Sequence, residues 1–179
     1  MSPIEAQIHR ARSLKIHFHG SKEADSRAQI QMSQLLAQHF SRWEELCLGL
    51  TSNILPLLIT IHGRLASLER LWIQWNDSER PDSLDCFWAA PSLVDFGAIH
   101  EDHFVPIWLP IHQLTRLELN APWETHKGIL KLAHSLIQVH IEIEFDDDEL
   151  WLDTDELVNL SHLRRRLYVT HPGAFQGFP

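Results

Sequence analysis

Apolar and polar residues recur along this chain in one short phrase: a leucine, two residues, an apolar residue, one residue, and a second apolar residue. The clearest copies occupy residues 68–73, 114–119 and 136–141. The end of each copy alternates between apolar and polar positions, and a period of two is typical of a β-strand that buries one face. We therefore predict a strand at each copy.

Weaker copies extend the series in both directions. The phrase recurs with Trp43 in the leading place, and again from Leu93. A last copy begins at Leu163 and contains an extra arginine, so that Leu167 and Val169 fall one step late. We expect a local bulge or register slip at that point.

The spacing of the copies indicates a repeat architecture. Their leading residues lie 21 to 27 residues apart, within the 20 to 29 residues of a leucine-rich repeat. An atypical first strand is predicted at 14–18, which alternates correctly without a leading leucine. One such unit cannot hide its own apolar residues, so neighbouring units must stack. The prediction is an α/β fold in one domain, residues 1–179: a leucine-rich-repeat solenoid, or horseshoe fragment, with parallel strands on the concave face and helices on the convex face.

The segments between the strands have helical character. Helices are expected at residues 26–40, 54–65, 83–90, 124–134 and 155–161. Asp82 and Thr154 stand where N-caps are expected, and Pro81 precedes the third of these helices. Each helix would form the second arm of a strand-and-helix unit.

Five phrases give the chain a family likeness: residues 14–20, 41–46, 68–73, 90–93 and 113–117. They resemble the leucine-rich-repeat region of F-box proteins from mushroom-forming fungi, in which an N-terminal F-box precedes a repeat tail. The likeness runs from about Leu14 to about His171. It implies capture of a protein substrate for a Skp–cullin ubiquitin ligase, with a Skp-type adaptor bound by the F-box. No F-box segment is found before Leu14, so a Skp-type adaptor is expected only if an F-box lies upstream. Residues 172–179 are expected to form an irregular tail rather than a capping repeat.

In such a solenoid the residues between the buried strand positions point outward along the concave face. The candidate protein-binding residues there are Arg70, Trp72, Gln74, Arg116, Glu118, Gln138, His140 and Tyr168, together with Glu45, Asp95 and Glu142. Trp72, Arg70, Arg116 and Tyr168 have the chemistry enriched at interface hot spots. Among the other tryptophans, Trp43 and Trp75 occupy inward positions, and core packing is expected of the seven as a group, Trp72 excepted.

Charge and cysteine content narrow the partners. A formal net charge of −9 opposes binding to phosphate backbones, so nucleic acid is not expected as a partner. The apolar stretch 54–61 is interrupted by Pro56 and is too short to span a membrane, and the N-terminus lacks a secretory signal. Cys47 and Cys86 show no metal or disulfide spacing and are expected to be small buried residues. A cytoplasmic or nuclear protein is predicted.

Several other chemistries are disfavoured. The thirteen histidines include His17 and His19 on one strand face and the sequence 100–103, but none has the spacing of a metal site, and no cofactor is expected. The acidic run 142–149 is expected to be a solvated loop and lacks the pattern of a calcium loop. No nucleophile elbow, phosphate-binding glycine loop or kinase signature occurs, so the chain is not expected to be an enzyme. The alternatives are a free-standing or truncated repeat scaffold without a ligase role, and a small hydrolase.

Overall fold

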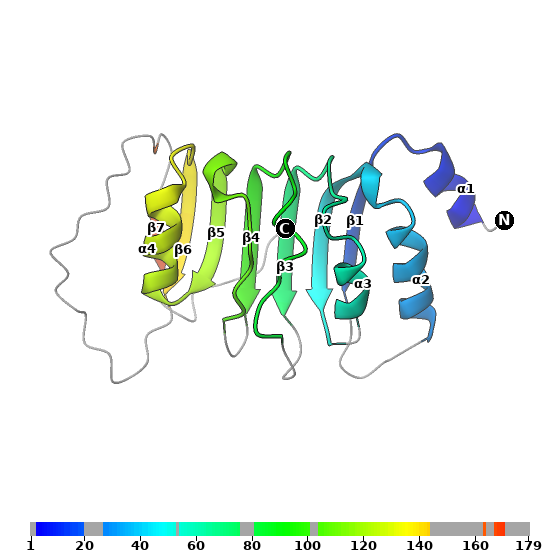
Figure 1. Cartoon of the computed structure of the whole chain (residues 1–179), viewed down its shortest axis with the longest axis horizontal. Helices are drawn as coiled ribbons and strands as arrows, with labels where there is room; N and C mark the ends of the chain where they lie inside the picture. The colour runs from blue at the N-terminus through cyan, green and yellow to red at the C-terminus, as the bar shows by residue number, and fades with distance from the viewer. Residues whose placement is uncertain are drawn as a thin grey trace, which may run out of the picture.

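The protein is an α/β structure built on one parallel sheet (Figure 1). The computed structural model describes residues 3–19, 27–52, 54–75, 81–100, 104–143, 163 and 167–170. The sheet has seven strands, which lie side by side in chain order from β1 to β7. They are β1 Leu14–His19, β2 Trp43–Leu50, β3 Arg70–Trp75, β4 Asp95–His100, β5 Arg116–Ala121, β6 Gln138–Ile143 and β7 Leu167–Thr170. The predicted parallel α/β arrangement is confirmed.

A copy of the repeated phrase accompanies each strand from β2 to β7, whereas β1 lacks the leading leucine, as predicted. Most strands begin two residues after the leading leucine, which lies in the turn before the strand and is completely buried at Leu68, Leu93 and Leu114. In the last pairing Val139 lies opposite Leu167 and Ile141 opposite Val169. Those two residues of β7 thus pair as the phrase requires, although they come one step late in the sequence. The bulge or register slip expected after Leu163 falls on residues outside the described part of the chain.

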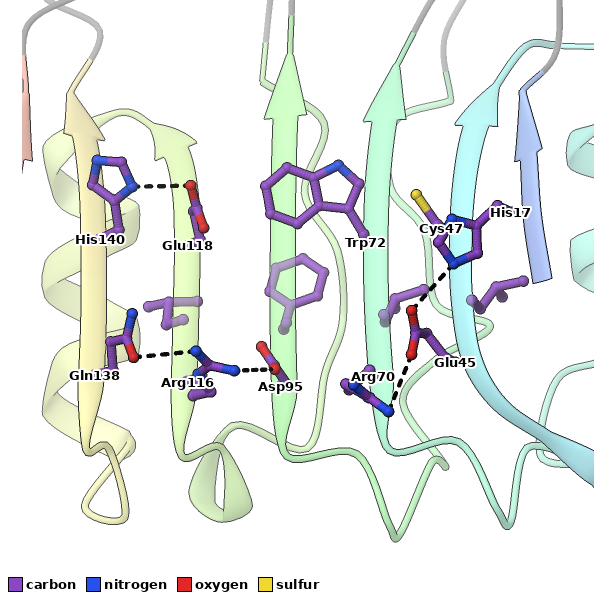
Figure 2. Close-up of a pocket in the computed structure, with 14 residues that line it drawn as sticks. His17, Glu45, Cys47, Arg70, Trp72, Asp95, Arg116, Glu118, Gln138 and His140 are labelled. Carbon is purple, nitrogen blue, oxygen red and sulfur yellow. Dashed lines mark hydrogen bonds and ion pairs between the residues drawn. The ribbon is translucent and has the colours of Figure 1, made fainter. Parts of the chain in front are cut away.

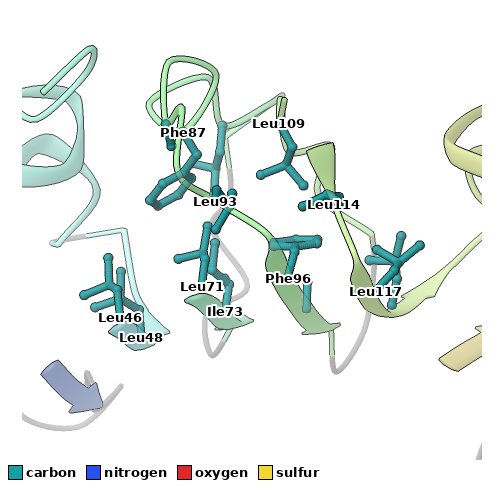
Figure 3. Close-up of a cluster of buried hydrophobic side chains, with 14 of the residues drawn as sticks. Leu46, Leu48, Leu71, Ile73, Phe87, Leu93, Phe96, Leu109, Leu114 and Leu117 are labelled. Atoms are coloured by element: carbon teal, nitrogen blue, oxygen red, sulfur yellow. The ribbon is translucent and has the colours of Figure 1, made fainter. Parts of the chain in front are cut away.

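Side chains from successive strands form continuous buried rows. One row runs through Ile16, Leu46, Leu71, Phe96, Leu117 and Val139, and a second through Leu48, Ile73, Ala98, Leu119 and Ile141, with registered partners in each neighbouring strand. Figure 3 shows Leu71, Ile73, Phe96 and Leu117 of these rows on the side of the sheet where Phe87 and Leu109 of the connecting segments lie. Because the inner strands bury their apolar residues against both neighbours, the described core extends from β1 to β6.

Hydrogen bonds repeat from one turn to the next at equivalent positions. The Ser67 hydroxyl donates to the Ser41 carbonyl at 2.9 Å, and the Ser92 hydroxyl donates to the Ala66 carbonyl at 2.8 Å. The amide side chain of Gln113 donates to the carbonyls of Ala90 and Leu93 at 2.9 and 2.8 Å. Backbone carbonyls in the segments before the strands therefore accept hydrogen bonds from side chains of the next unit.

The helices lie on one side of the sheet (Figure 1). They are α1 Pro3–Arg10, α2 Arg27–Ala37, α3 Leu55–Ile59 and α4 Trp123–Leu132, with short 3-10 helices at Phe40–Arg42 and Ile111–Gln113. The helices predicted at 26–40 and 124–134 are confirmed within three residues, whereas α1 was not predicted. In the part of the chain that the structure describes, no helix is both long enough and apolar enough to cross a bilayer.

Two helix predictions need correction. The helix predicted at 54–65 is limited to α3, because the chain turns after Ile59 and passes through Gly63, whose φ of 70° suits glycine. The segment predicted as a helix at 83–90 is not helical, so Asp82 caps no helix there. Leu84 instead forms a parallel bridge with Ile107 and donates its N–H to the Pro106 carbonyl at 2.8 Å. The helix predicted at 155–161, with its cap Thr154, lies outside the described residues, as does the tail 172–179.

The predicted burial of tryptophan and cysteine is only partly confirmed. Trp43 and Trp75 are buried, as is Cys86, whose burial raises the pKa of its thiol to about 12. Trp88 and Trp108 are instead 57% and 56% exposed and meet edge to face at 6.2 Å between ring centroids. Trp88 lies in a turn and Trp108 directly follows the bridge residue Ile107, so neither ring belongs to a helix face that packs on the sheet.

A buried histidine connects α4 to the sheet. His126 is fully buried, and its Nε2–H donates to the Glu142 carbonyl of β6 at 3.0 Å. Burial lowers the pKa of His126 from 6.5, despite the opposing effect of hydrogen bonds to the Glu142 and Ala121 carbonyls. The native state therefore holds this ring neutral.

This arrangement predicts acid-sensitive stability. Because the native pKa of His126 lies below the unfolded value of 6.5, the unfolded state binds the proton first as the pH falls. The contribution of His126 to the free energy of unfolding is therefore complete above pH 6.5 and is lost as the pH falls below it. We expect His126→Gln to flatten the dependence of the unfolding free energy on pH between 7.5 and 5.5, measured by urea titration. Glu142 is present in both proteins and contributes to both slopes, so an unchanged slope would contradict this role of His126.

Candidate protein-binding face

The side of the sheet opposite the helices carries polar side chains that converge over the strands (Figure 2). We call it the polar face and define it by two rows of registered residues. The first row is Lys15, Glu45, Arg70, Asp95, Arg116 and Gln138, and the second is His17, Cys47, Trp72, Gly97, Glu118 and His140. These residues alternate with buried core positions because successive side chains in a strand point to opposite faces.

Charges in the first row alternate in sign from strand to strand. At the β1 end, the Glu45 carboxylate lies 3.6 Å from the Lys15 ammonium, 3.1 Å from His17 Nε2 and 3.1 Å from the Arg70 guanidinium. Burial by itself would raise the pKa of Glu45, but the His17 hydrogen bond and the charges of Arg70 and Lys15 outweigh it and lower the pKa. Glu45 is therefore a fixed anion that orients three neighbours.

The other end of the row is held by one arginine. The Arg116 guanidinium donates to the Asp95 carboxylate at 3.2 Å and to the Gln138 side-chain oxygen at 3.3 Å. Opposite charges directly across strands stabilise a sheet by about 0.2–1 kcal/mol each, and exposed pairs fall at the low end. Arg116 is 54% exposed, so these contacts mainly fix the direction of the side chain.

The second row is centred on Trp72, whose indole extends from β3 over β4 (Figure 2). It occupies the space that a side chain at position 97 would need: a Cβ on Gly97 would lie 1.9 Å from the Cε3 and Cζ3 atoms of the ring. Glycine at this position therefore lets the ring lie against the β4 backbone. The next residue in the row is Glu118, which accepts a hydrogen bond from His140 at 2.9 Å.

Residues of both rows, Lys15 and Gly97 excepted, line an open groove of about 230 Å³ that runs from His17 on β1 to His140 on β6. Leu71, Phe96 and Leu117 also line it, although their side chains belong to the buried core row on the other face of the sheet. Six strands thus contribute to one surface, with an aromatic ring near its middle and charged pairs on both sides.

Most of the predicted binding residues lie on this face. Arg70, Trp72, Asp95, Arg116, Glu118, Gln138 and His140 all line the groove, as does Glu45. Gln74 is half-buried in β3 beyond the second row, and Tyr168 pairs with His140 through the backbone register, while its side chain lies outside the described residues.

Glu142 was predicted to be an exposed binding residue, and this is wrong. It lies beyond the second row in β6, beside Asn120 of β5, and is only 5% exposed. Burial raises the pKa of its carboxyl, the charge of His140 opposes the rise and the charge of Glu118 adds to it. The alternation places Glu142 on the correct side of the strand but does not report how deeply it is covered. Residues 144–149 of the acidic run lie outside the described residues.

Two polar-face residues that line the groove, His17 and Cys47, were not predicted as binding residues, nor was Gly97, against which the Trp72 ring lies. Cys47 was expected to be buried, but it is half-buried and faces the groove, because it stands between Leu46 and Leu48 in the alternation. The same period-two rule identifies His17. Gly97 could have been found from the registered strands, since it lies directly opposite Trp72.

Cys47, His17 and Glu45 have the residue types of a thiol–imidazole–carboxylate triad. Such a site needs a thiol whose pKa is lowered, because the thiolate is the nucleophile. Burial, and then the nearby Glu45 carboxylate, instead raise the pKa of Cys47. The local electrostatics therefore disfavour nucleophilic catalysis at this thiol. In the described ranges, no three His, Cys, Asp or Glu side chains are grouped so that they could hold a metal ion.

Comparisons with protein-family models, with curated proteins and with solved structures found no match for this chain.

Proposed function

We propose that the chain is a leucine-rich-repeat solenoid of one domain. Three observations support this reading. The strands follow one another in parallel and in chain order, the leading residues of the phrase recur every 21 to 27 residues, and equivalent hydrogen bonds such as Ser67 to Ser41 and Ser92 to Ala66 join successive units. A sheet that grows by one strand per repeat is what stacked units of this kind produce.

We further propose that the polar face binds a protein and that the chain is not an enzyme. The observation that carries this proposal is the groove across six strands, with Trp72 near its middle. Aromatic and arginine side chains near the centre of a patch, surrounded by polar contacts, are typical of interface hot spots. An open surface of this kind suits a macromolecular partner better than a small substrate, which usually needs a deeper pocket.

The resemblance to fungal F-box proteins gives this binding a role. By that likeness, the chain is the substrate-recognition part of an adaptor for a Skp–cullin ubiquitin ligase, acting in the cytoplasm or nucleus. Both cysteines are free, which agrees with a reducing compartment. Binding of a Skp-type adaptor would need an F-box outside the present sequence.

The proposal predicts that partner binding depends on the polar face. We expect a variant with Arg70→Ala, Trp72→Ala and Arg116→Ala to retain its partner at least about 30-fold more weakly, since hot-spot truncations cost about 2 kcal/mol or more. The measurement is quantitative affinity capture from native extract of the source cells. Far-ultraviolet circular dichroism of each protein checks that the fold is kept.

A matched control carries the same types of substitution outside the groove: Arg12→Ala, Arg64→Ala and Trp88→Ala, all at exposed positions. Proteins retained by the original chain and by this control, but lost by the polar-face variant, would support the proposal. If the polar-face variant and the original chain retain the same proteins in equal amounts, the polar face is not the binding surface.

A further inference from the structure

The centre of the polar face combines an aromatic ring with nearby carboxylates. The indole of Trp72 lies over Gly97 and lines the groove. Glu118 follows Gly97 in the same row, on β5, and Asp95 lies two residues before Gly97 on β4. Because position 97 has no side chain, no residue of β4 separates the ring from Glu118 in this row. An aromatic face beside carboxylates is a favourable setting for a cation.

The charges of this part of the face do not balance. The strands β4, β5 and β6 are described in full, and the carboxyl groups among them are Asp95, Glu118 and Glu142. Arg116 is the one lysine or arginine in these three strands, and it already bonds to Asp95. His140 compensates Glu118 only when its ring is protonated. Glu118 is therefore the polar-face carboxylate of these three strands whose ion-pair partner is a histidine instead of a lysine or arginine, in a chain whose formal net charge is −9.

We propose that Trp72 and Glu118 form a subsite for an arginine side chain of the protein partner. This inference rests on the proposed function and specifies its chemistry. The guanidinium stacks on the indole and donates hydrogen bonds to the Glu118 carboxylate, which is 23% exposed. The aliphatic part of the arginine lies along the β4 and β5 segments at Phe96 and Leu117, which line the groove while their side chains are buried in the core.

Arginine fits this subsite better than lysine or an apolar residue. Its planar guanidinium can stack on an aromatic ring and still donate hydrogen bonds, within its own plane, to a carboxylate. An ammonium is instead a compact and strongly hydrated point charge. An apolar anchor would desolvate Glu118 without replacing its lost hydrogen bonds to water, and this is costly. The groove thus selects a side chain that is both flat and positively charged.

A small-molecule titration of the full chain tests the subsite. The probe is N-acetyl-arginine methylamide, followed at pH 7.5 by ¹H–¹⁵N NMR of the labelled protein. The compared probe is the citrulline analogue, which has nearly the same shape without the charge. We expect the arginine probe to shift the Trp72 indole N–H and the Gly97 amide, and the citrulline probe to bind about three- to tenfold more weakly, the range of a partly exposed cation–π contact. The Trp72 signal is identified by its loss in Trp72→Phe.

Two variants complete the test. Glu118→Gln should weaken arginine binding by at least about threefold, whereas Glu124→Gln, a matched change on the exposed side of α4, should leave it unchanged. The inference is overturned if citrulline binds as well as arginine, if Glu118→Gln has no effect, or if the shifts occur at Trp88 and Trp108 instead. None of these results would decide whether the polar face binds a protein, because the capture experiment tests that proposal. The two proposals can therefore fail separately.

Discussion

Replacing Leu117 with alanine should lower the free energy of unfolding by about 2–5 kcal/mol, the range for removing a fully enclosed leucine side chain. Leu117 is 2% exposed and lies in the first buried row, between Phe96 of β4 and Val139 of β6. The loss combines the transfer free energy of the three side-chain carbons that alanine lacks with the cost of a cavity that two neighbouring strands cannot close. A cost of this size is a large part of the stability of an ordinary domain.

The measurement is equilibrium unfolding in urea, followed by circular dichroism. Leu132→Ala supplies a matched control, because Leu132 lies at the end of α4 and is 58% exposed. That change should alter the free energy of unfolding by less than about 0.5 kcal/mol. Equal effects of the two substitutions would show that Leu117 is not part of a closed core, and would count against stacked repeats.

The strands could be predicted from sequence because their pattern has a simple physical cause. A strand that buries one face must alternate, and a unit that buries its leucines against copies of itself must repeat the same spacing. The leading leucines of the phrase, such as Leu68, Leu93 and Leu114, therefore recur at one position of each repeat and show where it begins. Even the late strand β7 obeys the rule in space, since Leu167 lies opposite Val139 despite the extra residue before it.

The connecting segments were less predictable because their contacts decide between conformations of similar local preference. Residues 83–90 contain apolar residues that suit a helix, yet Leu84 pairs with Ile107 in an extended bridge. The exposed pair of Trp88 and Trp108 follows from that pairing. Helix α3 is short because the turn at Gly63 ends the segment early. None of these contacts is visible in a local pattern.

The sequence predicted which strand residues point toward the candidate site, but it did not predict how deeply each of them is buried. Alternation correctly selected the outward residues of β3, β5 and β6, including Trp72 and Arg116. It failed at Glu142, since burial depends on what lies above a strand and not only on which way the side chain points. It also did not reveal the contact between Trp72 and Gly97, which depends on the register of two strands 25 residues apart in the sequence.

That contact leads to the second large effect. The change that Gly97→Ala makes in the free energy of unfolding should have opposite signs in the presence and in the absence of the Trp72 ring. The new Cβ would lie 1.9 Å from two carbons of the Trp72 ring, so the indole must leave its place over β4. Overpacking of this kind costs about 1–3 kcal/mol. Partner binding should fall as far as it does in Trp72→Ala, although the indole is still present. Unfolding in urea and quantitative capture measure the two effects.

In the Trp72→Ala background the same Gly97→Ala change meets no ring. The φ of Gly97 is not positive, since Gly63 is the glycine with a positive φ among the described residues, so alanine fits the β4 backbone without strain. Alanine then restricts the unfolded chain more than glycine does, and the change should be neutral or stabilise the protein by about 0.5–1 kcal/mol. A double-mutant cycle isolates the coupling between the two positions. If Gly97→Ala has the same effect in both backgrounds, the ring does not rest on β4, and the basis for the arginine subsite is removed.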